Sequence, residues 1–375
     1  MMRAMPLSSA NPPAGGRGGA LDGLRFVAAL LIVLYHYGTE APVALQSLHP
    51  VFARGYLATD FFLILSGFVL GRAYGAQVLS GRIGLLDFLR KRIARIWPGQ
   101  LFVLAALAAV VAAAALSGVA PEHPENFTPV AMVMQALMVQ AWGLPGGGGW
   151  NHQSWSLSAL IVCYAAFPLA WRWIGRMTSP SALLALGLSA VMVGDLICVA
   201  VLDHPIYDLG FHLGVVRAAP LFLLGVCIAR VVEQGHPPVP VARVLAGLAL
   251  AALALLQVAG RFDLASLIAI AAIVLSFGRL PVARPSRTLE QAAKLSFALF
   301  ITHALTGLVW FGALGVVRAR LDLAPWMDWT LWAASVPAAF VVAALFHHLI
   351  DDPVQKWLAP RLAARKRAVA APASA

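Results

Sequence analysis

The sequence predicts an all-α protein, a polytopic membrane bundle of about ten transmembrane helices with both chain termini on the cytoplasmic side. Of its 375 residues, 61% are hydrophobic and only 11% are charged, and the mean hydropathy is +0.81. This composition is typical of integral membrane proteins. Apolar runs of about 20 residues, the length that spans a bilayer, recur along the chain. Because these runs do not alternate with polar residues, they indicate helices and exclude a β-barrel.

The predicted spans divide the chain into three parts. Residues 1–20 are polar and rich in Gly, Pro and Ala, so we expect a disordered cytoplasmic N-terminus, no cleavable signal peptide, and a first span that acts as a signal anchor. Residues 21–358 form the transmembrane domain, and residues 359–375 form a basic, disordered cytoplasmic tail. The ten spans lie near 24–39, 57–75, 97–118, 155–175, 181–202, 213–232, 241–259, 262–279, 295–317 and 328–349.

The net charge of +11 follows the connections between these spans. Most Arg and Lys residues fall on the side of the N-terminus, and the other side holds only Arg54, Arg261, Arg318 and Arg320. This asymmetry is the positive-inside rule, and it predicts the topology. We therefore attribute the basic excess to topology and to contact with anionic lipids of the bilayer, and we expect no nucleic-acid partner.

The longest connection, residues 119–154, contains an apolar stretch at 129–142 and a glycine run at 146–149. A partial helix followed by glycines suggests a re-entrant or lid element over a cavity, although a flexible connector explains the segment equally well.

Cysteine and histidine spacings indicate no metal site. Cys163, Cys198 and Cys227 lie inside apolar runs at unrelated spacings, so they read as core residues without a disulfide. The pair His347 and His348 precedes two aspartates, but the spacing is not that of a recognised metal motif.

Two ionisable residues stand in the first span, "GLRFVAALLIVLYHYG". Arg25 and His36 are separated by three helical turns plus roughly 20°, so they share one face about 16 Å apart along the axis. Ionisable groups within a membrane are costly and indicate function by default. The alternatives are that Arg25 reaches the headgroups and that His36 is a hydrogen-bonded core residue.

Other polar residues lie within or beside the later predicted spans, and each has a functional and a structural interpretation. Arg92 and Arg95 lie three apart at the cytoplasmic entrance of the third span, where they suit phosphate groups or simply follow the positive-inside rule. Arg217 lies within a span and needs an anion or a carbonyl cage. His303 is a lone polar residue on an apolar helix, either a satisfied core histidine or a catalytic one.

Seven motifs occur in order over residues 21–358: "LDGLRFVAALLIVLYHYG", "TDFFLILSGFVLG", "RKRIARIWP", "SWSLSALIVCYAAFP", "RAAPLFLLGV", "LSFALFITH" and "DDPVQKWL". In this arrangement the chain resembles the acyltransferase-3 family of integral-membrane O-acyltransferases. The resemblance implies that His36 and Arg25 are catalytic and that Arg25, Arg92 and Arg95 bind the phosphates of the donor. It also implies supporting or substrate-binding roles for Asp60, Ser66, Trp155, Ser156, Tyr164, Arg217 and His303.

The resemblance implies transfer of an acyl group from cytoplasmic acyl-CoA, usually acetyl-CoA, to a hydroxyl of a cell-surface carbohydrate or glycolipid, in a bacterial inner membrane. His36 would act as the general base or would carry the acyl group itself. A secondary transporter for an anionic solute, or a catalytically impaired relative that serves as a scaffold in polysaccharide assembly, remains an alternative.

One position departs from the family pattern. Four residues after Ser156, where members usually carry a glutamate, this chain has Leu160. His152, Glu122 and Glu125 of the long connection are the candidate substitutes.

Overall fold

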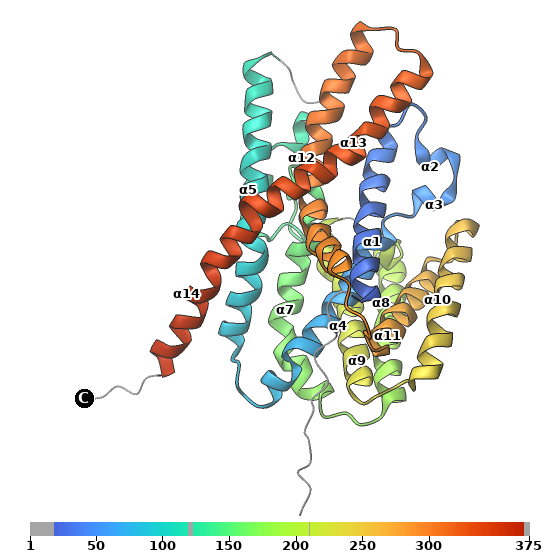
Figure 1. Cartoon of the computed structure of the whole chain (residues 1–375), viewed down its shortest axis with the longest axis vertical. Coiled ribbons are helices and arrows are strands. Elements are labelled where there is room, and N and C mark those ends of the chain that lie inside the picture. Colours follow the sequence, from blue (N-terminus) through green and yellow to red (C-terminus); the bar gives the residue numbers. More distant parts are fainter. Residues whose placement is uncertain (1–18, 119–122, 210, 371–375) are drawn as a thin grey trace, which may run out of the picture.

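A computed structural model describes residues 19–118, 123–209 and 211–370, the last eight of these by backbone alone. The described chain is entirely helical, without a strand, and its long helices run up and down past one another (Figure 1). The helices are α1 (Ala20–Tyr37), α2 (Leu45–Leu48), α3 (Pro50–Ala53), α4 (Leu57–Leu79), α5 (Leu85–Leu116), α6 (Pro129–Leu137), α7 (Trp155–Ile174), α8 (Pro180–Leu202), α9 (Gly214–Glu233), α10 (Val239–Ala259), α11 (Asp263–Arg279), α12 (Arg287–Arg320), α13 (Pro325–Phe346) and α14 (Asp352–Ala370).

The predicted spans all appear as helices. Nine helices in the described part of the chain are long and apolar enough to cross a membrane. The eighth predicted span, residues 262–279, is α11, whose 17 residues lie at the short end of the range for a span. The fold class predicted from composition and apolar runs is therefore confirmed.

The core is tightest where α4 crosses α9. A Cβ atom on Gly67 would lie 2.1 Å from the carbonyl oxygen of Phe222, and one on Gly225 would lie 1.9 Å from that of Ile64. Any larger residue at either glycine would hold the two backbones apart. Small residues commonly allow this kind of close packing between membrane helices. The same two helices carry Asp60 and Arg217, so their close contact positions part of the site.

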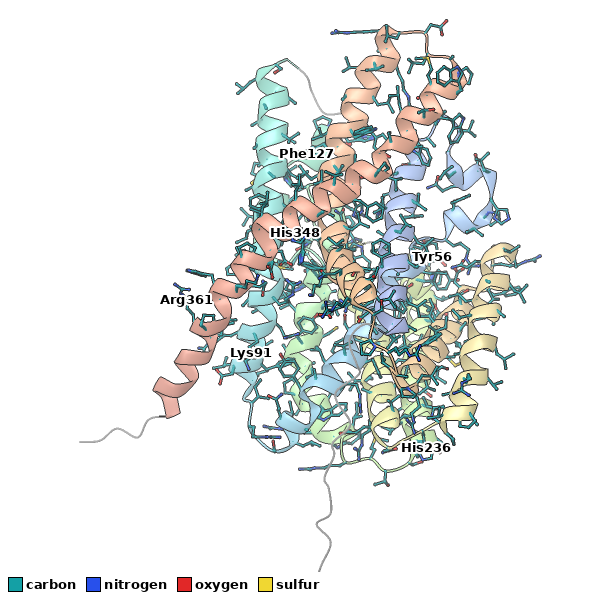
Figure 2. The ribbon with its side chains drawn as sticks, in the orientation of Figure 1. Tyr56, Lys91, Phe127, His236, His348 and Arg361 are labelled. Carbon is teal, nitrogen blue, oxygen red and sulfur yellow. The ribbon has the colours of Figure 1, made fainter. Side chains whose placement is uncertain are left out.

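The short connections 80–84, 175–179, 234–238 and 280–286 gather at one end of the bundle, named the basic end below, where α1 and α12 begin. Figure 2 shows Lys91 and His236 towards this end and Phe127 towards the other. At the opposite end, Arg54 is buried and pairs with Asp263. Because α1 starts at the basic end, Arg25 lies near that end and His36 near the other.

The connection between α5 and α7 is packed into the bundle, which favours the re-entrant interpretation over a loose connector. Trp97 of α5 donates to the carbonyl of Ala136 in α6 at 2.7 Å. After the glycine run the chain enters the core, where fully buried Asn151 donates to the side chain of Gln100 at 2.8 Å. Residues 119–122, including Glu122, lie outside the described residues.

The C-terminal segment differs from the prediction of a disordered tail from residue 359. After a π-helical turn, His347–Asp351, the chain continues as α14 to Ala370. Residues 359–370 are rich in Ala, Arg and Lys, which have high helix propensity, so they extend the helix despite their concentrated positive charge. Residues 371–375 lie outside the described part of the chain, as do residues 1–18 of the predicted N-terminal segment.

Candidate active site

Two cavities open between the helices that carry the predicted site residues. The first, the arginine cavity, has a volume of about 640 Å³, and its lining includes Asp22, Arg25, Ser66, Arg72, Arg92, Arg95, Ser156, Leu160 and Tyr164. The second, the histidine cavity, has a volume of about 540 Å³, and its lining includes Tyr35, His36, Tyr56, His152, Trp155, Asp208 and Arg217. Thr59 contributes to both linings. The two cavities therefore approach each other beside the first turn of α4.

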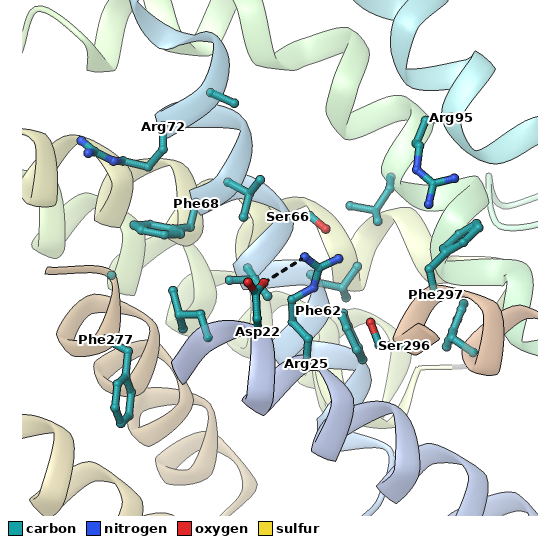
Figure 3. A pocket seen from close by; sticks show the side chains of 18 of the residues that line it. Asp22, Arg25, Phe62, Ser66, Phe68, Arg72, Arg95, Phe277, Ser296 and Phe297 are labelled. Atoms are coloured by element: carbon teal, nitrogen blue, oxygen red, sulfur yellow. Dashed lines mark ion pairs between the residues drawn. The ribbon is translucent and has the colours of Figure 1, made fainter. Parts of the chain in front are cut away.

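Arg25 stands in the middle of the arginine cavity, as Figure 3 shows. One of its terminal nitrogens lies 3.7 Å from the carboxylate of Asp22, three residues earlier on α1. Its Nε atom is buried and has no hydrogen-bond partner among the described residues. Since an unpaired buried donor is costly, this guanidinium is suited to bind an anion in the cavity.

Arg92 and Arg95 line the same cavity but differ in their partners. Arg92 donates to the hydroxyl of Tyr74 at 2.6 Å and keeps a buried, unpartnered Nε. Arg95 makes two hydrogen bonds, at 2.6 and 3.3 Å, to the carboxylate of Asp351 and lies over the ring of Phe297. Arg95 therefore already has an anionic partner, whereas Arg92 and Arg25 retain free donors.

Ser66, Ser156 and Tyr164 also line the arginine cavity, and so does Leu160. The position that departs from the family pattern thus faces the cavity rather than lipid. Of the candidate substitutes, Glu125 is exposed at 68% of its side chain and pairs with His123, so it does not reach the site. His152 belongs to the histidine cavity.

A histidine pair joins α1 to α12 at the histidine cavity. Nδ1 of His36 lies 3.0 Å from Nε2 of His303, and their rings stack with centroids 5.0 Å apart. Nδ1 of His303 faces the carbonyl oxygens of Phe300 at 2.8 Å and Leu299 at 3.2 Å. His303 is thus placed against His36 rather than being an isolated core residue.

The hydrogen bonds of this pair determine its tautomers. Carbonyl oxygens only accept hydrogen bonds, so Nδ1 of His303 carries the proton and, in the neutral ring, Nε2 keeps the lone pair. That lone pair accepts from His36, which must then be protonated at Nδ1. Nε2 of His36 is left as an unprotonated nitrogen, which is the form that a general base requires.

Arg217 finds its anion in Asp60. The guanidinium makes two hydrogen bonds to the fully buried carboxylate, both at 2.8 Å. It also lies 5.5 Å from the ring of Trp155 and 5.8 Å from that of Tyr56. This bidentate pair fixes α4 against α9 and supports the wall of the histidine cavity, so Asp60 and Arg217 act there as structural partners.

Beyond this wall, Tyr56 is held by a network that the sequence did not reveal. Its hydroxyl donates to Asp263 at 2.6 Å, and the same carboxylate accepts from Arg54 at 2.7 Å. Burial raises the pKa of the Tyr56 phenol further above neutral pH, so the hydroxyl is a proton donor in this network. The sequence placed Arg54 only on the less basic side of the membrane. It could not indicate the partner of Arg54, because Asp263 lies 209 residues away in the chain.

The structure also adds Arg72 and Asp351 to the residues identified from sequence. Arg72 lines the arginine cavity from α4, and Asp351 holds Arg95 while lying 3.4 Å from His347. Arg72 directly follows the second motif and lies within the predicted span 57–75. An arginine within a predicted span was the signal that could have identified it. The described residues contain no group of three or more His, Cys, Asp or Glu that could hold a metal ion.

Comparison with known proteins identifies the family. A family model described as "Acyltransferase domain" matches residues 19–348. "Protein 2 in picA locus" of Rhizobium radiobacter is 33% identical over 187 residues, which cover 46% of this chain and 91% of that protein. "Acyltransferase MdmB" of Streptomyces mycarofaciens is 31% identical over 174 residues, 44% of this chain and 42% of that protein. No solved structure matches. The chain therefore belongs to the acyltransferase-3 family and is a multi-pass membrane acyltransferase.

Proposed function

We propose that the protein transfers an acyl group, in the simplest case acetyl, from cytoplasmic acyl-CoA to a hydroxyl of a carbohydrate or glycolipid acceptor in the inner membrane of a bacterium. The observation that carries this proposal is the histidine pair, because it presents a basic nitrogen of His36 at a cavity. The arginine cavity at the basic end supplies cationic groups for the phosphates of the donor.

The donor would lie with its phosphates near Arg25 and Arg92, whose Nε atoms are buried without partners. In this arrangement the thioester extends along α1 towards His36, about 16 Å from Arg25 along the helix axis. Arg95, already paired with Asp351, would act mainly by its positive charge at the rim.

The acceptor hydroxyl would enter the histidine cavity, whose aromatic rings and polar groups suit a sugar-like molecule. Nε2 of His36 takes the hydroxyl proton as the oxygen attacks the thioester carbonyl. The carbon–sulfur bond breaks, the CoA thiolate leaves, and the imidazolium returns its proton to the thiolate. His303 accepts from Nδ1 throughout and holds the ring in place.

The same nitrogen can alternatively attack the thioester itself and carry the acyl group to the acceptor as acyl-histidine. Rapid quenching followed by peptide mass spectrometry separates the two routes, because only the second one adds the acyl mass to the peptide that contains His36.

The deciding experiment uses labelled acetyl-CoA and membranes that contain the wild-type protein or His36→Ala, with label measured in surface glycans. We expect the variant to lose about 10²- to 10⁴-fold of the transfer rate. His123→Ala is the matched control, because His123 is exposed at 65% of its side chain and lines neither cavity. Undiminished transfer by His36→Ala, at equal protein levels, would refute the mechanism.

Leu160→Glu tests the alternative of an impaired relative, since Leu160 lines the arginine cavity. If the wild type transfers no label and Leu160→Glu does, the missing carboxylate has silenced this chain, and the scaffold interpretation gains support. Label that appears with the wild type shows instead that leucine is compatible with catalysis.

A further inference from the structure

Arg72 is the arginine of the arginine cavity to which the proposed mechanism gives no role. It projects from α4 into the lining, and its Nε atom is buried without a hydrogen-bond partner among the described residues. The only carboxylate in the lining, within the part of the chain that the structure describes, is that of Asp22, which lies beside Arg25. A half-buried guanidinium with an unpartnered Nε is suited to bind an external anion.

The position of Arg72 sets it apart from the other cavity arginines. Figure 3 shows Arg72 and Arg95 at opposite margins of the cavity, with Arg25 between them. Along α4, Arg72 lies 13 residues, or about 20 Å, from Thr59, which is where the two cavities approach each other. The cavity therefore offers cationic groups at two separate places. Arg72 occupies the place that is farther from Thr59, and so from the histidine cavity that contains His36.

We propose that Arg72 binds the 3′-phosphate of the CoA donor, while Arg25 and Arg92 bind its diphosphate. This inference rests on the proposed function. In acyl-CoA the thioester and the 3′-phosphate are at opposite ends of the molecule, so a donor whose thioester approaches His36 directs its 3′-phosphate away from it. A phosphate monoester also matches the donor geometry of a guanidinium. The enzyme would thereby select CoA thioesters over donors that carry phosphopantetheine alone.

The phosphate of an anionic lipid headgroup is the competing source of the same chemistry, because arginines near a helix end can reach the membrane surface. The arrangement favours the CoA phosphate, since Arg72 lines the same cavity as Arg25 and Arg92, whose Nε atoms are also buried without partners.

The test measures binding of acetyl-CoA and of acetyl-dephospho-CoA, which lacks the 3′-phosphate, to the full chain in nanodiscs of neutral lipid. We expect the wild-type protein to bind acetyl-CoA about tenfold more tightly. In Arg72→Gln the Kd for acetyl-CoA should rise about tenfold and match that for the dephospho analogue. The control, Arg82→Gln, removes an equal charge from an exposed position after α4 and should keep the wild-type preference.

The results separate the possible failures. If the wild type binds acetyl-CoA and Arg72→Gln keeps the preference for the 3′-phosphate, the assignment of Arg72 is wrong and the proposed function stands. If Arg72→Gln changes the affinity for acetyl-CoA only in nanodiscs that contain anionic lipid, Arg72 binds lipid headgroups. This result would also overturn the inference. A wild-type protein that binds neither compound contradicts the proposed donor itself.

Discussion

A single hydrogen bond between His36 and His303 determines which nitrogen of His36 is free to act as a base. The bond depends on two backbone carbonyls, those of Phe300 and Leu299, because they hold the proton on Nδ1 of His303. Their influence reaches His36 only through the imidazole of His303, much as a carboxylate orients the histidine of a catalytic triad. His303 is therefore a positioning residue, and it differs from His36 in the substitutions that it should tolerate.

At position 303, glutamine should preserve function better than leucine. The amide oxygen of Gln can accept from Nδ1 of His36, whereas Leu leaves that N–H unpaired and the tautomer undefined. We expect His303→Leu to lower kcat by at least about tenfold, a part of the 10²- to 10⁴-fold contribution of a general base. His303→Gln should recover much of this loss with an unchanged KM for the donor. Equal kcat values for the two variants would show that the side chain at position 303 only fills space.

At the scale of elements, the contact between α4 and α9 links packing to the site. The glycines that let the two backbones approach lie about two turns from Asp60 and Arg217, so the spacing of the helices sets the geometry of the ion pair. Sequence reasoning identified both charged residues but treated them separately, because nothing local indicates that positions 60 and 217 meet. The pairing is a property of the helix crossing, in which the glycines of "LSGF" and "LLGV" each pack against the backbone of the opposite helix.

Gly225→Ala should destabilise the protein, because the added methyl group would collide with the carbonyl of Ile64. Overpacking of this kind costs about 1–3 kcal/mol, so the midpoint of thermal unfolding in detergent should fall. Gly247→Ala is the control, since Gly247 lies in α10 and a Cβ atom there meets nothing within 4 Å. Alanine at that position should be neutral or stabilise the helix by up to about 1 kcal/mol. Equal midpoints for the two variants would contradict a close crossing of α4 and α9.

At the scale of the whole molecule, the sequence predicted the bundle well because its signal is local. Each span is a continuous apolar run, and each was found as a helix, including the short α11. The partners of the site residues were not predictable in the same way. Asp351 lies 256 residues from Arg95, and His303 lies 267 residues from His36, so only the assembled bundle brings them together. Helical periodicity placed Arg25 and His36 on one face but could not show that they line two different cavities.

The final prediction concerns the orientation of this bundle in the membrane. The positive-inside rule places the basic end in the cytoplasm, and the proposed mechanism requires this orientation, because CoA must enter the arginine cavity from that side. Ala283→Cys and Asp322→Cys place thiols in exposed connections at the basic and the opposite end, respectively. The native Cys163, Cys198 and Cys227 are buried and should not react. An impermeant maleimide added to spheroplasts should label Asp322→Cys alone, whereas inside-out vesicles should expose Ala283→Cys. Labelling in the reverse order would place the arginine cavity outside and exclude a cytoplasmic CoA donor.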